Sequence, residues 1–129
     1  MASVKTRSRK TAMKIDGLNL KVEDVYAAAH SEVSVKLTGE ARKAIEKSRE
    51  SVLKKLQDRK VVYGITTGFG KFKDVFIQPE NSLQLQRNFI LSHAAGVGPL
   101  FESPYVRAIT LLRANALAKG FSGIRVEVV

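Results

Sequence analysis

Apolar residues recur at every third or fourth position in four stretches of this 129-residue chain, which is the spacing of an amphipathic helix. Residues that start or end helices flank these stretches: Ser103-Pro104 precedes the last one and Gly120 follows it. The predicted helices are Val22–His30, a helix that opens at Thr38-Gly39-Glu40 and carries Ala41, Ile45, Val52 and Leu56, a helix capped by Asn81 or Ser82 that ends near Gly96, and Pro104–Lys119. Ser122 would cap a further helix, but only seven residues follow it, so we expect the sequence to continue beyond Val129.

Two shorter stretches alternate between apolar and polar residues and predict strands. One is Val33–Leu37. The other is Met13–Leu20, where Asp16-Gly17 between alternating apolar residues predicts a β-hairpin. Together the helices and strands predict a mainly α chain with a small β portion.

The composition narrows the class of protein. Hydrophobic residues make up 44% and charged residues 26%, as in ordinary globular domains. The absence of cysteine excludes disulfides, zinc–thiolate sites and cysteine nucleophiles, and the two histidines, His30 and His93, are too far apart in sequence to suggest a metal site. No apolar stretch approaches the ~20 residues of a membrane span, and no secretory signal opens the chain. We therefore expect a metal-free protein of a reducing, cytoplasmic compartment.

The net charge of +10 suggests nucleic acid as a candidate binding partner. Four of the 22 basic residues and none of the 12 acidic ones lie in residues 1–12, which we interpret as a disordered basic arm or a leftover of an expression tag. Eight of the other 18 basic residues lie in Ala41–Lys60, where acidic residues alternate with them as on the solvated face of a helix. No aromatic residues are interleaved there to stack on bases, so we expect at most non-specific phosphate binding by the arm.

A glycine-rich loop, Gly64–Gly70, follows the β-branched, extended stretch Val61-Val62-Tyr63. Its glycines do not match the spacing of a phosphate-binding loop or of a dinucleotide-binding fingerprint. The loop is instead suited to support a nearby ligand site, because glycines permit positive φ angles and threonine hydroxyls can hold neighbouring backbone. The supporting residues are Gly64, Thr66, Thr67, Gly68 and Gly70.

Three polar residues have both a structural and a functional interpretation. Tyr63 is either a half-buried strand aromatic with a wet hydroxyl or a general base, which needs surroundings that stabilise its phenolate. His93, near a predicted helix end among small residues, is either a capping or buried histidine or a ligand contact. Asn115 lies within an apolar stretch and needs a hydrogen-bond partner, which favours a role in packing between helices.

Three segments resemble the aromatic amino-acid ammonia-lyase family, and within it the histidine ammonia-lyases. They are Tyr63–Phe72 (YGITTGFGKF), Leu85–Gly98 (LQRNFILSHAAGVG) and Leu112–Arg125 (LRANALAKGFSGIR). The resemblance covers roughly residues 13–129 and identifies them as the N-terminal segment of an ammonia-lyase domain. It implies the N-terminal part of an aspartase/fumarase-like helical lyase subunit, assembled as a homotetramer with active sites shared between chains.

The resemblance also implies a reaction and its residues. The family removes ammonia from an aromatic amino acid, with Tyr63 in the position of the catalytic acid/base. His93 is in the position that lines the pocket for the substrate's side chain, where a histidine fits histidine or tyrosine substrates better than phenylalanine. With histidine the products are urocanate and ammonia, a step of histidine catabolism.

The electrophile of this family is methylidene-imidazolone (MIO), formed from an internal Ala-Ser-Gly. The chain contains no such tripeptide; Phe121-Ser122-Gly123 is the nearest match and belongs to a different motif. We therefore expect the tripeptide a little beyond Val129 and expect residues 1–129 alone to be inactive.

Details of the motifs leave the substrate open. Thr66 stands where histidine enzymes commonly carry asparagine, and Gly98-Pro99-Leu100-Phe101 resembles tyrosine aminomutases. Lys71–Val75 and Arg113–Ala116 look more like the histidine enzymes, so we favour histidine. The alternatives are a tyrosine or phenylalanine ammonia-lyase, a tyrosine 2,3-aminomutase and, from other classes, a non-catalytic basic nucleic-acid-binding module or a subunit that completes the site of a larger partner.

Overall fold

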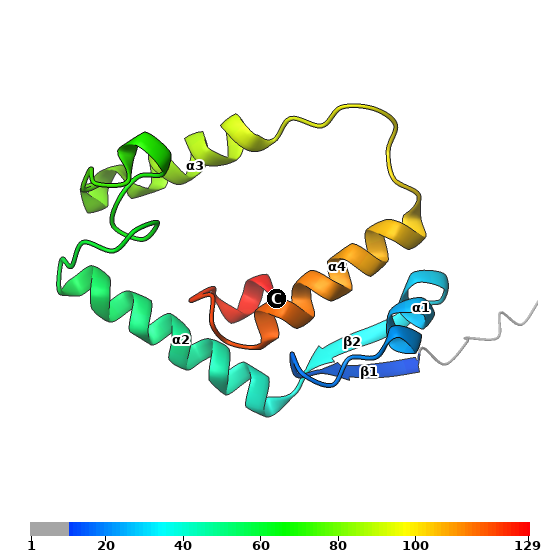
Figure 1. The fold of residues 1–129 in the computed structure, drawn as a ribbon. Helices are drawn as coiled ribbons and strands as arrows, with labels where there is room; N and C mark the ends of the chain where they lie inside the picture. The colour runs from blue at the N-terminus through cyan, green and yellow to red at the C-terminus, as the bar shows by residue number, and fades with distance from the viewer. Residues whose placement is uncertain (1–10) are drawn as a thin grey trace, which may run out of the picture. The chain divides into compact units, whose positions relative to one another are not determined.

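The computed structural model describes residues 11–129 (Figure 1). These residues form two compact units, one made of the chain up to Ser48 together with Phe101–Val129, the other of Arg49–Leu100. The boundary lies within the long helix α2, Gly39–Gln57. Helices dominate the described residues, and one two-stranded sheet accompanies them, so the predicted fold class is confirmed.

The first unit contains a strand–helix–strand arrangement. The strands β1 (Thr11–Ile15) and β2 (Val33–Leu37) pair in parallel over their whole length, and α1 (Val22–His30) connects them. Parallel neighbours need such a crossover, whereas a hairpin joins antiparallel strands. The prediction of a hairpin in Met13–Leu20 is therefore wrong, while the predicted Val22–His30 helix and Val33–Leu37 strand are confirmed.

The turn after β1 is held by hydrogen bonds to the Asp16 carboxylate and to the side chain of Asn115. The Asp16 carboxylate accepts hydrogen bonds from the backbone N–H groups of Asn19 (2.9 Å) and Leu18 (2.8 Å), and these bonds lower the pKa of the carboxyl to about 2. The Gly17 N–H donates to Oδ1 of Asn115, at 2.9 Å. The turn therefore leads into α1 and ties the chain to the fourth helix, where Asn115 has the partner that its apolar surroundings require.

The core of the first unit lies between α1, the sheet and α4 (Ser103–Ala118), which packs against α1. Ile15, Ala28 and Leu111 are buried at its centre. The partly buried residues around them are Met13, Leu20, Val25, Val33, Leu37 and Ala114.

The α4 helix begins one residue earlier than predicted. Glu102 occupies the N-cap, so Ser103 is not the cap but the first helical residue. Pro104 then lies in the first turn, where its missing N–H costs no helical hydrogen bond. The helix ends at Ala118, one residue before the predicted end, and Gly120 follows with a φ of +73°.

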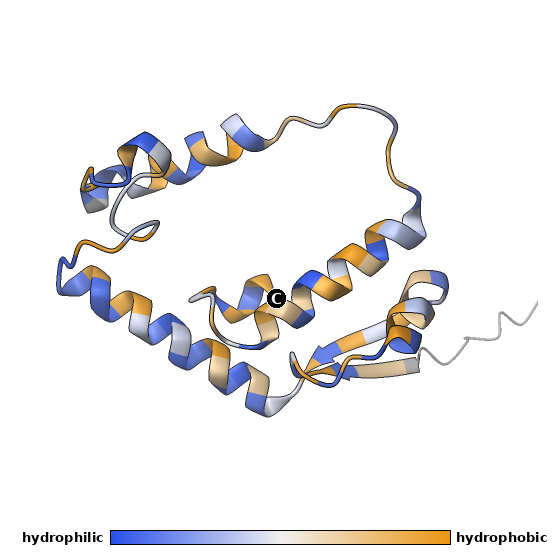
Figure 2. Ribbon diagram, viewed as in Figure 1, coloured by the Kyte–Doolittle hydropathy of each residue, from blue (hydrophilic) through white to orange (hydrophobic). Residues whose placement is uncertain are grey.

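The long helix α2 opens as predicted. The Thr38 hydroxyl accepts a hydrogen bond from the Ala41 N–H at 3.2 Å, which caps the helix. Ala41 and Ile45 are buried, but the predicted apolar stripe is less covered further along, where Leu56 is 40% exposed. Figure 2 shows hydrophilic positions interspersed with fewer hydrophobic ones along this helix, as expected of a largely solvated helix.

The second unit consists of the end of α2, an irregular stretch and α3 (Ser82–His93). Residues 61–63 form no strand; the stretch contains an isolated bridge between Thr67 and Phe76 and a short 3₁₀-helix, Gly70–Phe72. Asn81 is at the N-cap of α3 without a side-chain cap hydrogen bond, and the helix ends three residues before Gly96.

The two ends of the chain differ from the predictions in detail. Thr11 and Ala12, expected within the basic arm, belong to β1, and the rest of the arm lies outside the described residues. After α4, Ser122 caps no α-helix; a short 3₁₀-helix, Val126–Val128, follows instead. The Gly123 N–H donates to Oγ of Ser48 at 2.9 Å and so ties this last segment to α2.

Candidate active site

Two buried threonines hold the loop that follows Tyr63. The Thr66 hydroxyl donates to the Lys60 carbonyl at 2.7 Å and accepts from the Val62 N–H at 2.8 Å. The Thr67 hydroxyl accepts from the Gly64 N–H at 3.3 Å and donates to the Gly68 carbonyl at 3.1 Å. Thr66 and Thr67 are 4% and 1% exposed, so these bonds satisfy polar groups that water hardly reaches.

Glycine is needed in this loop for two different reasons. Gly64, directly after Tyr63, has a φ of +71°, which most other residues adopt only with strain. Gly68 lies so close to Phe72 that an added Cβ would be 2.6 Å from the Cβ of that residue. Gly70 also has a positive φ, +57°, and opens the 3₁₀-helix. The backbone of the loop therefore favours glycine at all three positions.

Tyr63 occupies the rim of this loop. Its ring meets the ring of Phe69 edge to face, with centroids 6.0 Å apart at an interplanar angle of 74°. The residue is 63% exposed. Tyr63 is thus held from one side and open on the other, an arrangement that leaves it accessible to a small molecule.

His93 is the last residue of α3 and is exposed. Its Nδ1 lies 2.9 Å from the Phe89 carbonyl oxygen and 2.9 Å from Oγ of Ser92. Its ring also lies against the Phe89 ring, with centroids 4.3 Å apart and planes inclined by 34°. The preceding helical turn therefore fixes both the position and the orientation of the imidazole.

These contacts join the two candidate residues within the second unit. Phe69 stacks on Phe89, with centroids 4.5 Å apart and an angle of 28°. Tyr63, Phe69, Phe89 and His93 consequently form one continuous row of rings, which we call the aromatic row. Sequence reasoning singled out its two ends but missed Phe69 and Phe89, although both lie inside the segments that carry the family resemblance.

The described residues alone do not enclose a complete substrate pocket here. A cavity of about 60 Å³ lies beside the loop, lined among others by Gly64, Thr66 and Phe69, and it has room for a few water molecules but not for an amino acid.

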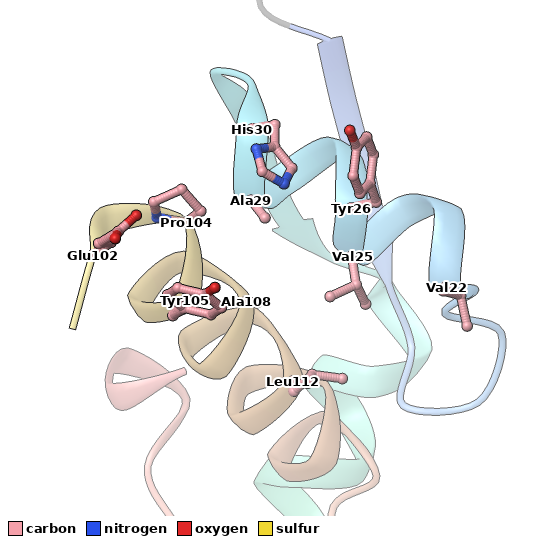
Figure 3. A pocket seen from close by; sticks show the side chains of 10 residues that line it. All are labelled: Val22, Val25, Tyr26, Ala29, His30, Glu102, Pro104, Tyr105, Ala108 and Leu112. Carbon is pink, nitrogen blue, oxygen red and sulfur yellow. The ribbon is translucent and has the colours of Figure 1, made fainter.

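A larger cavity, of about 510 Å³, lies in the first unit between α1 and α4 (Figure 3). Its wall is mostly apolar, and its polar lining residues are Tyr26, His30, Glu102 and Tyr105. Neither Tyr63 nor His93 lines it. This cavity is therefore not the site to which the motifs point.

Within residues 11–129 no three histidine, cysteine or acidic side chains gather in a way that could hold a metal ion. None of the helices in this part of the chain combines the length and the apolar character needed to cross a membrane.

Comparison with known proteins identifies the chain's relatives. Residues 20–129 match the aromatic amino acid lyase family. The histidine ammonia-lyase of Caldanaerobacter subterraneus subsp. tengcongensis is 54% identical over 115 residues, which are 89% of this chain and 23% of that protein. The histidine ammonia-lyase of Bacillus velezensis is 48% identical over 115 residues, which are 89% of this chain and 22% of that protein. The chain thus spans less than a quarter of the length of these relatives.

Solved structures agree with this relationship. The ergothioneine-degrading enzyme ergothionase of Treponema denticola superimposes with a TM-score of 0.86 at 34% identity, covering 91% of this chain and 24% of that one. The tyrosine aminomutase of Streptomyces globisporus superimposes with a TM-score of 0.85 at 36% identity, covering 92% and 22%. The resemblance seen in the motifs therefore extends to the fold and to most of the chain, and the chain belongs to the aromatic amino acid lyase family.

Proposed function

We propose that the protein carrying this chain is a histidine ammonia-lyase, which converts L-histidine to urocanate and ammonia. The observation that carries the proposal is the aromatic row, because it connects the residue at the family's acid/base position, Tyr63, with the residue at its side-chain pocket position, His93. The names of the two curated relatives support histidine as the substrate.

In the proposed reaction, residues of this chain transfer a proton, contact the substrate and support the loop around Tyr63. The Tyr63 hydroxyl is the acid/base that moves a proton at the substrate, and its 63% exposure leaves it open to the ligand. His93 contacts the substrate's side chain. The loop around Tyr63 keeps its backbone in place through the two threonine hydroxyls and the glycine conformations described above. The supporting residues are Gly64, Thr66, Thr67, Gly68 and Gly70.

The cofactor of this proposal is MIO, which supplies the electrophile that ordinary side chains lack. The 129 residues contain no Ala-Ser-Gly from which it could form. We therefore place the MIO-forming tripeptide in a part of the protein outside these residues and expect them to be inactive on their own. We also propose a cytoplasmic homotetramer, the assembly that the family resemblance implies.

The Tyr63→Phe substitution in the full-length protein tests the proposal. The change removes only the hydroxyl, so the edge-to-face contact with Phe69 and the fold are expected to persist. Urocanate formation, followed by its ultraviolet absorbance, should fall at least ~100-fold, in line with the loss of a general acid/base. Circular dichroism and sedimentation should remain unchanged. Undiminished turnover by the variant would remove Tyr63 from the mechanism.

Tyrosine chemistry is the second candidate, as a tyrosine ammonia-lyase or tyrosine 2,3-aminomutase. The resemblance of Gly98-Pro99-Leu100-Phe101 to tyrosine aminomutases and the similarity in structure to the Streptomyces enzyme favour it. Assaying the full-length protein with histidine and with tyrosine separates the two: urocanate indicates the first, and coumarate or β-tyrosine the second. The absence of any product from either substrate would contradict both candidates and favour the non-catalytic alternatives.

A further inference from the structure

The cavity between α1 and α4 in the first unit, which we call the α1–α4 cavity, has the size and the lining of a small-molecule site (Figure 3). Its volume of about 510 Å³ lies within the range of roughly 300–1,000 Å³ that is typical of ligand pockets, which are mostly apolar with a few polar groups. Val25, Ala29, Ala108 and Leu112 supply apolar surface from both helices. A ligand that fits this cavity must therefore have an apolar body.

Aromatic rings form much of the remaining lining. Tyr26 and His30, one helical turn apart on α1, have ring centroids 4.4 Å from each other. Tyr105 lies across the cavity from them, in the first turn of α4 (Figure 3). Aromatic side chains pack well against another flat ring, and the face of a tyrosine ring also attracts a cation. This lining favours a ligand that carries a ring over one with a flexible alkyl chain.

The charge at the α1–α4 cavity is negative, although the chain as a whole is basic. Of the lysines and arginines within residues 11–129, none lines the cavity, whereas Glu102 does. Glu102 occupies the N-cap of α4 without capping it through its side chain, and its carboxylate has no hydrogen bond or ion pair to the described residues. An uncommitted carboxylate beside aromatic rings attracts a cation and repels an anion.

We propose that the α1–α4 cavity binds aromatic amines, with the ammonium group beside the Glu102 carboxylate and the ring between α1 and α4. An aromatic amino acid fits less well, because its carboxylate would lie next to that of Glu102. The site is separate from the aromatic row, since neither Tyr63 nor His93 lines the cavity. The proposal therefore does not depend on the proposed function.

Three indole compounds that differ in the group at the end of a short side chain test the proposal on the 129-residue chain. Tryptamine carries an ammonium group, tryptophol a hydroxyl and indole-3-propionate a carboxylate. The chain contains no tryptophan, so the fluorescence anisotropy of the indole reports only on the ligand.

At pH 8 we expect tryptamine to bind about tenfold more tightly than tryptophol, the combined effect of an exposed ion pair and a cation–π contact. Indole-3-propionate should bind most weakly of the three. Equal affinities for tryptamine and tryptophol would overturn the proposal, and so would the absence of binding by all three compounds.

The Glu102→Gln substitution removes the charge and keeps the size of the side chain. Because that side chain does not cap α4, the helix should keep its start. The preference for tryptamine over tryptophol should fall to about threefold, the part contributed by the rings. Glu127→Gln, which removes an exposed acid that does not line the cavity, is the matched control and should keep the full preference. Equal preferences in the two variants would mean that the overall charge of the chain, not Glu102, selects the amine.

The Ala108→Phe substitution tests whether the compounds occupy this cavity. The added phenyl group fills space between α1 and α4 and should weaken the binding of tryptamine by at least ~tenfold. Ala116→Phe places the same group at an exposed position of α4 that does not line the cavity, and this variant should bind like the unchanged chain. Circular dichroism checks that both variants keep their helices. Equal binding by the two variants would place tryptamine elsewhere and overturn the proposal.

The full-length protein separates the two candidate occupants of the cavity. Since the chain spans less than a quarter of its relatives' length, another part of the same subunit is the rival to a small molecule. Calorimetry on the full-length protein should give the same preference for tryptamine over tryptophol. Binding by the 129-residue chain but not by the full-length protein would show that the rest of the subunit fills the cavity, which would overturn the proposal. Turnover assays test the proposed function alone and have no bearing on the amine.

Discussion

Thr66 is the single residue with the most hydrogen bonds in the loop behind Tyr63. Its hydroxyl serves the Lys60 carbonyl and the Val62 N–H, and its own N–H donates to the Val62 carbonyl at 2.9 Å. Valine has nearly the same shape but no hydroxyl. The Thr66→Val substitution would therefore leave two backbone groups without this partner while the packing stays the same.

We expect Thr66→Val to lower the free energy of unfolding by about 1–3 kcal/mol, the cost of leaving buried polar groups unsatisfied. Urea denaturation of the 129-residue chain measures it. Thr66→Ser, which keeps the hydroxyl, is the control and should lose clearly less. Equal losses in the two variants would show that the methyl group, not the hydroxyl, stabilises the loop.

At the scale of single residues, the sequence indicates which residues are candidates for function but not which side chains they contact. The exposed Tyr63 and His93 stand out because a tyrosine before a glycine-rich loop and a histidine among small residues are unusual enough to notice. Phe69 and Phe89 do not stand out, since an aromatic residue in a loop or on a helix ordinarily indicates core packing. Their stacking arises from the loop folding over α3, which no local pattern records.

Backbone hydrogen bonds define the end of α2, although the residue at its left-handed position is not the glycine that favours this conformation. The Arg59 N–H donates to the Leu56 carbonyl and the Lys60 N–H to the Lys55 carbonyl, both at 3.2 Å, which is a Schellman motif. Arg59 occupies the left-handed position of that motif with a φ of 51°, where glycine is the usual residue. The helix thus ends at a strained arginine.

The Arg59→Gly substitution should therefore stabilise the chain. Relief of the left-handed conformation contributes about 1–2 kcal/mol, and the greater freedom of glycine in the unfolded chain offsets about half of it, which leaves a gain of roughly 0.5–1 kcal/mol. Thermal unfolding followed by circular dichroism is the measurement. Arg59→Ala removes the same side chain but keeps the Cβ, so it should gain nothing; a similar gain from alanine would mean that the arginine side chain, not its backbone, is unfavourable.

Element by element, the helices are predicted better than the pairing of the strands. Val22–His30 has an apolar stripe and matches the structure at both ends. The hairpin fails because Asp16-Gly17 indicates only that the chain turns, and the same turn serves equally to enter a helix. The partner of β1 lies beyond α1, so the pairing is decided by the core around Ile15 rather than by the turn.

On the scale of the whole molecule, much apolar surface of the second unit is uncovered. α3 has no buried residue, and Leu83, Ile90 and Leu91 on it are 82%, 64% and 69% exposed. Apolar surface of this extent ordinarily marks an interface. Because the chain spans less than a quarter of its relatives' length, the remaining lyase subunit is the natural cover for these residues in the proposed enzyme. In the proposed enzyme, residues outside these 129 would also complete the pocket around the aromatic row.

Within the first unit, the two chain segments that are distant in sequence come into contact just after α4. Gly120, after α4, lies against α2 so closely that an added Cβ would be 2.6 Å from the backbone carbonyl carbon of Ala44. Its φ of +73° independently disfavours any other residue. The approach of the two segments is therefore possible only with glycine at this position.

Gly120→Ala should accordingly destabilise the first unit by at least ~2 kcal/mol, since the left-handed conformation costs about 1–2 kcal/mol and the overlap with α2 adds a further overpacking cost of about 1–3 kcal/mol. The free energy of unfolding from urea denaturation measures this loss. Gly39→Ala is the matched control, because Gly39 has open space around the added Cβ, and helix propensity there favours alanine by less than ~1 kcal/mol. A loss at Gly120 no larger than the change at Gly39 would mean that α4 and α2 can separate without cost, so that the contact does not join the segments.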